Sequence, residues 1–117
     1  YPQKKKIVSK ETSENMKMIL ESVVTEGSGS KASVEGYQVG AKTGTSEKLP
    51  RRSGKYIASC IGFAPADDPK VLAVVLIDEP EGIYYGGTIA APVVSELLDN
   101  ALPYLGVKKT PQKQTKK

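Results

Sequence analysis

The sequence contains no histidine, no tryptophan and a single cysteine. Without histidine, the chain has no imidazole for acid–base chemistry and no Ser-His-Asp triad of its own. The single cysteine, Cys60, excludes an internal disulfide, and such a residue most often serves as a small buried apolar side chain. No grouping of cysteine and carboxylate residues has the spacing of a metal site, so we expect neither a metal nor another cofactor.

Long apolar segments are lacking as well. The longest apolar run, residues 71–77, is much shorter than the roughly 20 residues that a membrane-spanning helix requires. The N-terminal residues also lack the apolar core of a signal peptide. We therefore expect any membrane anchor to lie outside this sequence.

Positive charge is in excess, but it is concentrated at one end of the chain, which has 17 basic and 13 acidic residues. Five of the basic residues lie at the C-terminus: Lys108, Lys109, Lys113, Lys116 and Lys117. Without these five, 12 basic residues face 13 acidic ones. No basic residues alternate with aromatic ones, so we expect no nucleic-acid partner. Because residues 108–117 have no apolar side chain, they are predicted to form a disordered basic tail after a single domain, residues 1–107.

Hydrophobic periodicity predicts a helix near each end of this domain. Apolar residues recur at helical spacing between residues 16 and 24, with Thr12 or Ser13 as the expected N-cap. The polar loop at residues 27–30 should end this helix. Residues 92–102 have the same periodicity, and Pro92 suits the first turn of a helix.

Three segments between these helices have the pattern of β-strands: residues 37–46, 56–63 and 71–77. Their connections are short, which favours an antiparallel meander. The predicted fold class is therefore α+β, with an N-terminal and a C-terminal helix covering one face of a three-stranded antiparallel sheet. The apolar run at residues 71–77 is more typical of a central strand than of an edge strand. The meander should therefore be part of a larger sheet whose other strands come from elsewhere.

The first predicted strand ends in Lys42-Thr43-Gly44-Thr45. At Gly44 a peptide-like ligand could approach the strand edge closely and pair with it as an added strand. Lys42 would supply a fixed cation that holds an anionic substrate end and favours deprotonation of a neighbouring nucleophile or base. The hydroxyls of Thr43 and Thr45 can donate to a ligand carboxylate. For the tetrapeptide alone, a hairpin strand that ends in turn-forming residues is the alternative interpretation.

Residues 36–48 as a whole resemble the Lys-Thr-Gly strand of class B penicillin-binding proteins. Residues 9–13, 61–65 and 84–92 also resemble segments of this family, in the family's order. The overall pattern is similar to transpeptidases of Gram-positive, clostridium-like bacteria. In the third segment, the two tyrosines and two glycines are expected to have a structural role near the rim of the active site.

The resemblance implies that the complete enzyme is a D-Ala-D-Ala transpeptidase, which cross-links peptidoglycan through a serine acyl-enzyme and is acylated by β-lactams. Lys42 and Thr45 would be catalytic, with the N–H of Thr45 as one half of the oxyanion hole, and Thr43, Gly44 and Thr45 would bind substrate. The implied partners are the remainder of a penicillin-binding or β-lactamase-like transpeptidase fold, the peptidoglycan stem peptide and β-lactams. The implied location is the extracellular face of the plasma membrane.

Two segments have the spacing of the family's other two motifs, Ser-x-x-Lys and Ser-x-Asn. Residues 28–31 have Ser-x-x-Lys spacing, and residues 13–15 have Ser-x-Asn spacing. Both come in the wrong order, and the nucleophilic serine should begin a helix, whereas Ser28 falls in a predicted loop. We therefore predict that neither is functional and that the chain alone is inactive. Two alternatives stay open: part of a β-lactamase or β-lactam sensor with the same fold, or a non-catalytic binding module.

Overall fold

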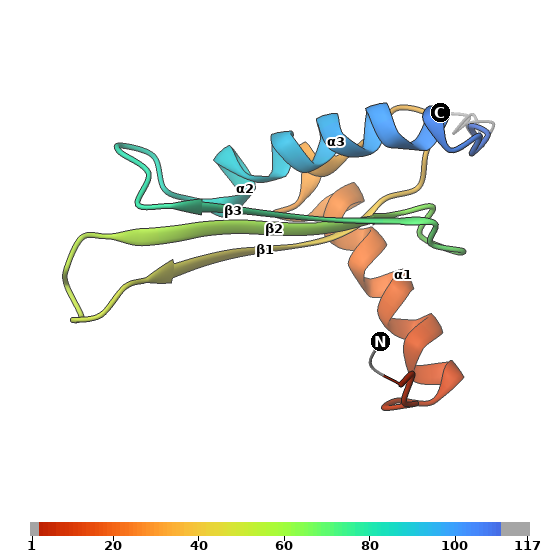
Figure 1. Ribbon diagram of the computed structural model, residues 1–117, viewed down its shortest axis with the longest axis horizontal. Helices are drawn as coiled ribbons and strands as arrows, with labels where there is room; N and C mark the ends of the chain where they lie inside the picture. Colours follow the sequence, from red (N-terminus) through yellow and green to blue (C-terminus); the bar gives the residue numbers. More distant parts are fainter. Residues whose placement is uncertain (1–2, 111–117) are drawn as a thin grey trace.

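The computed structural model of the chain describes residues 3–110 and contains a single three-stranded sheet in that range. The elements are, in order, α1 (Lys10–Glu26), the 3-10 helix η1 (Ser30–Ala32), β1 (Gly40–Glu47), β2 (Tyr56–Ala64), β3 (Val71–Asp78), α2 (Gly86–Ile89) and α3 (Ala91–Tyr104). Both strand pairs are antiparallel, and the strand order is β1-β2-β3. The predicted α+β meander with a helix near each end is confirmed (Figure 1).

The boundaries of α1 differ from the prediction at one end. Ser9 caps the helix, because its hydroxyl accepts a hydrogen bond from the N–H of Thr12 at 3.1 Å. The prediction of Thr12 or Ser13 as the N-cap was wrong, since the first turn of α1 is exposed and has no apolar residue to mark it. The C-terminal end is as expected: α1 stops at Glu26, and the glycine-containing turn follows.

The first strand begins later than the predicted residue 37. Val34 and Tyr37 instead form an isolated bridge around a tight turn, in which Gly36 has a φ of 83° that favours glycine. The N–H of Thr110 donates to the carbonyl of Gly36 at 2.8 Å. Most of the predicted C-terminal tail, from residue 111 onward, lies outside the described residues.

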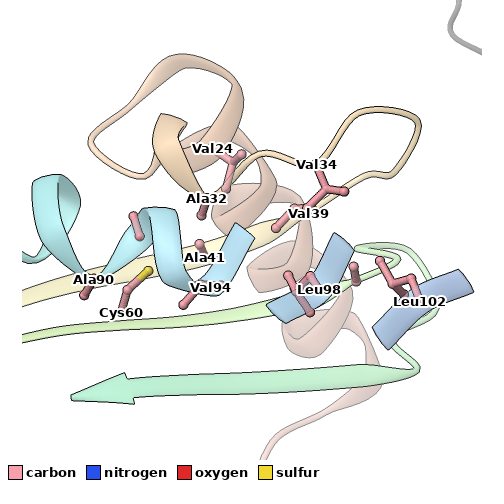
Figure 2. Close-up of a cluster of buried hydrophobic side chains, with 12 residues drawn as sticks. Val24, Ala32, Val34, Val39, Ala41, Cys60, Ala90, Val94, Leu98 and Leu102 are labelled. Carbon is pink, nitrogen blue, oxygen red and sulfur yellow. The ribbon is translucent and has the colours of Figure 1, made fainter. Parts of the chain in front are cut away.

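Helices cover one face of the sheet, and the core lies between the two layers. The strand β2 buries Ala58, Cys60 and Ala64 on this face. The helix α3 buries large aliphatic residues that include Leu98 and Leu102, which belong to the same cluster of buried side chains as Cys60 (Figure 2). Burial raises the pKa of the Cys60 thiol, so this group remains protonated and apolar in character. The buried residues of β2 are small, and a Cβ added at Gly62 would lie 2.5 Å from Val94 on α3, so this helix lies close to the sheet.

The opposite face of the sheet is uncovered within the described part of the chain. On β3, Leu72, Val74 and Leu76 are 63%, 56% and 69% exposed. The outer edge of β3 also has no neighbouring strand in residues 3–110. An apolar strand with an open face and an open edge is what the prediction of a larger sheet requires.

Candidate active site

The Lys-Thr-Gly motif lies in β1, whose only neighbour among residues 3–110 is β2. Just past the strand, the N–H of Lys48 donates to the carbonyl of Lys55 at 2.7 Å. Residues of an antiparallel pair alternate between bonding to the neighbouring strand and pointing away from it. Because Lys48 bonds to the neighbouring chain segment, the even-numbered residues of β1 are the ones that bond to β2. The main-chain N–H and C=O of Thr43 and Thr45 therefore point to the open edge of the sheet.

The side chains of the motif alternate between the two faces of the sheet. Lys42 is exposed on the uncovered face, opposite Ile61 in the register. Its Nζ donates to the carbonyl of Thr43 at 2.6 Å, and no carboxylate in the described range forms an ion pair with it. The hydroxyls of Thr43 and Thr45 lie on the helix-covered face. A ligand along the edge would therefore meet a cation on one side and two hydroxyls on the other.

The short helix α2 lies against the motif. The N–H of Gly86 donates to Thr45 Oγ1 at 3.1 Å. A Cβ at this position would collide with the carbonyl oxygens of Gly44 and Ser59, so α2 can lie this close to β1 and β2 only because residue 86 is glycine. Neither of the two helices predicted from the sequence includes this segment, so α2 was missed. The two consecutive glycines were the one available signal of a close approach.

The turn between α1 and η1 also reaches the motif. Ser28 Oγ lies 3.3 Å from Thr43 Oγ1. Ser28 occupies a turn rather than the start of a helix, as predicted, and Ser13 and Asn15 are exposed on α1. The contact between Ser28 and Thr43 was not predicted, since no sequence pattern joins a loop serine to a strand threonine.

Packing among three tyrosines holds the loop before α2 against the hairpin of β1 and β2. The rings of Tyr56 and Tyr84 stack with their centroids 3.9 Å apart, and the ring of Tyr85 lies 4.6 Å from that of Tyr84. Tyr56 Oη donates to the carboxylate of Glu47 at 3.0 Å, and this hydrogen bond raises the pKa of Tyr56. The contacts agree with the structural role expected for Tyr84 and Tyr85.

Other kinds of site have little support in the described range. Between residues 3 and 110, no three cysteine or carboxylate side chains gather where they could hold a metal ion. No helix in that range combines the length and the apolar character needed to cross a bilayer.

Comparison with known proteins shows which family the chain belongs to. Residues 1–99 match the penicillin binding protein transpeptidase domain family. The chain belongs to this family. The transpeptidase chain is 52% identical over 111 residues to Stage V sporulation protein D of Bacillus subtilis (strain 168), a match that covers 90% of the chain and 17% of that protein. It is 40% identical over 114 residues to the probable peptidoglycan D,D-transpeptidase PenA of Neisseria flavescens, covering 93% of the chain and 28% of that protein.

The fold agrees with a solved member of the family. The apo structure of the TP domain from Burkholderia pseudomallei penicillin-binding protein 3 is similar with a TM-score of 0.84 at 35% identity, and the match covers 95% of this chain and 35% of that one. The transpeptidase chain thus corresponds to a part of such a domain, as the sequence predicted. Of the alternatives left open, the names of these relatives favour a transpeptidase over a β-lactamase.

Proposed function

We propose that this chain supplies the ligand-docking edge strand of a penicillin-binding D-Ala-D-Ala transpeptidase, which cross-links peptidoglycan and is acylated by β-lactams. The observation that carries the proposal is the open edge of β1 at the Lys-Thr-Gly motif. An extended peptide laid along this edge would find the main-chain N–H and C=O of Thr43 and Thr45 available for strand pairing.

Each motif residue has a role that fits its position. Lys42 is a fixed cation that attracts an anionic ligand and favours the deprotonated form of a nucleophile nearby. The hydroxyls of Thr43 and Thr45 donate to the ligand carboxylate. The N–H of Thr45 forms one half of the oxyanion hole, a contribution of about 3 to 4 kcal/mol for such a donor. Gly44 leaves the uncovered face beside the edge without a side chain, and a Cβ there would lie 2.5 Å from Ser59 Oγ on β2.

The nucleophile in this proposal comes from the remainder of the transpeptidase domain. A serine there attacks the carbonyl carbon of the penultimate D-alanine, the terminal D-alanine leaves, and an acyl-enzyme remains. The open edge and apolar face of β3 are the surface on which that remainder would add its strands. We further propose a Gram-positive, clostridium-like source, supported by the identity with the Bacillus subtilis relative, and a location on the extracellular face of the plasma membrane.

A chimera tests this function. In it, the chain replaces the matching 111-residue segment of Stage V sporulation protein D. A fluorescent penicillin should label the chimera covalently at a serine outside this chain, because the chain supplies docking groups and the host supplies the nucleophile. The chain alone should remain unlabelled. Absence of labelling in a folded chimera, or stoichiometric labelling of the isolated chain at Ser28, would contradict the proposal.

The proposed interface at the open edge of β3 leads to a second prediction. Just past β3, the N–H of Glu79 donates to the carbonyl of Tyr56, so the odd-numbered residues of β3 bond to β2. The amides of Leu72, Val74 and Leu76 therefore point away from β2 and should exchange with solvent in the isolated chain. In the chimera they should gain protection of at least about a hundredfold, because a neighbouring strand would bond them. Hydrogen exchange followed by mass spectrometry or NMR measures this. The alternate amides of Ala73 and Val75, which bond to β2, are the internal control. Equal exchange of the first set in both proteins would remove β3 from the interface.

A further inference from the structure

The turn after α1 places an additional hydroxyl beside the motif. Ser28 Oγ and Thr43 Oγ1 are 3.3 Å apart, and either atom could be the donor. The other threonine of the motif, Thr45, accepts a hydrogen bond from the N–H of Gly86. Each threonine hydroxyl of the motif therefore has one hydrogen-bond partner among residues 3–110, and both partners come from segments outside the sheet.

The main chain fixes the position of Ser28. The N–H groups of Gly27 and Gly29 both donate to the carbonyl of Val23, at 3.1 Å each, which ties the turn to the end of α1. On the other side, a Cβ added to Gly87 would lie only 2.6 Å from the carbonyl oxygen of Ser28. The turn is thus held between the end of α1 and the beginning of α2. The hydroxyl of Ser28 reaches Thr43 from this fixed position.

The direction of the hydrogen bond follows from the number of hydrogens available. A hydroxyl has one hydrogen to donate and two lone pairs that accept. When Thr43 donates its hydrogen to a carboxylate at the open edge, its oxygen can only accept from Ser28, so Ser28 is then the donor. Hydrogen bonds arranged in such a chain strengthen one another. The hydroxyl of Thr45 has its hydrogen bonds in the same direction. Its oxygen already accepts from the N–H of Gly86, so its hydrogen is left to donate to a ligand.

We propose that Ser28 is a positioning residue for carboxylate recognition: its O–H donates to Thr43 Oγ1 and directs the hydrogen of Thr43 toward the carboxylate of a peptide or β-lactam. This inference rests on the proposed function. Ser28 is the serine of the segment with Ser-x-x-Lys spacing, and in this role it forms no covalent bond with the ligand. Ser28 acts through Thr43 and need not contact the ligand.

The experiment uses the chimera with Ser28→Ala, together with Ser28→Thr, which keeps a hydroxyl. The second-order acylation rate constant is measured with a penicillin that carries its free carboxylate and with the methyl ester of the same penicillin. Ser28→Ala should lower the rate constant for the free acid about fivefold, the size expected for one neutral hydrogen bond, and leave the ester unchanged. Ser28→Thr should restore most of the loss. Ser30→Ala, in the neighbouring 3-10 helix, is the matched control and should behave as the unsubstituted chimera.

The possible failures are distinguishable. If the unsubstituted chimera folds but is not acylated, the proposed function is overturned, and the role of Ser28 with it. If that chimera is acylated and Ser28→Ala reacts equally fast with the free acid, the role of Ser28 alone is overturned. The same conclusion follows if Ser28→Ala slows the acid and the ester equally, because the serine then supports the fold rather than the carboxylate contact.

Discussion

Lys42→Ala in the chimera is expected to slow acylation by a β-lactam about ten- to hundredfold, the loss that corresponds to one hydrogen bond to a charged group made in the transition state. The melting temperature should change little. Lys42 is exposed, and its described hydrogen bond goes to the carbonyl of the adjacent Thr43. Its charge therefore acts on whatever approaches the edge of β1 rather than on the core. The measurement is the second-order acylation rate constant together with the melting temperature.

Lys48→Ala is a matched control for this substitution. Lys48 follows the same strand, but its Nζ is paired with the carboxylates of Asp78 and Glu79 at 2.9 Å each. Removing it breaks surface ion pairs and should leave the acylation rate nearly unchanged. An unchanged rate for Lys42→Ala would remove that residue from the active site. A rate loss accompanied by an equal collapse of the melting temperature would make Lys42 a structural residue instead.

The strands could be predicted because each is a short segment bounded by turn-forming residues, and short turns between the segments leave few topologies other than a meander. Which face of β3 is covered could not be predicted. Its exposed residues Leu72, Val74 and Leu76 are as apolar as the half-buried residues between them, so the sequence does not show the alternation that the structure has. The N-cap of α1 could not be predicted in the same way. Several serine and threonine residues stand near the start of that helix, and only the backbone at Ser9 decides which of them caps it.

The candidate site could be proposed from the sequence as a string of residues but not as an arrangement in space. Adjacent positions in a strand place Lys42 and Thr43 on opposite faces, which the prediction of their roles did not address. The partners of the two threonines come from Ser28 and Gly86, far from the motif in sequence. Such contacts depend on how a turn and a short helix pack on the sheet. A sequence pattern confined to one element contains no information about them.

Gly86→Ala is expected to reduce both the stability and the acylation rate of the chimera. The added methyl group would meet the carbonyl oxygens of Gly44 and Ser59, which belong to the main chain and cannot rotate away as a side chain can. Overpacking of this kind costs about 1 to 3 kcal/mol. Relief of the collision would move α2 away from β1 and break the hydrogen bond from Gly86 to Thr45 Oγ1. Urea unfolding and the acylation rate constant measure the two effects.

Thr88→Ala is the control for this second substitution, since it shortens a half-buried side chain in the same helix without adding atoms. It should leave the acylation rate within about twofold of the unsubstituted value, a difference of less than about 0.5 kcal/mol in the barrier. If Gly86→Ala were as stable and as reactive as the unsubstituted chimera, α2 would not lie on the strands as the structure has it.

The open edge of β1 has a cost as well as a use. A strand that stays available to a peptide ligand is equally available to the edge of another copy, and proteins usually prevent such pairing by covering the edge or interrupting it. Neither arrangement is possible at β1 if a ligand binds along this edge, as we propose. Charge is compatible with both demands, because a lysine on the edge repels a second copy of itself yet attracts an anionic ligand. Lys42 in the edge strand β1 is therefore placed to act as a gatekeeper against aggregation, in addition to the role toward the substrate that we propose for it.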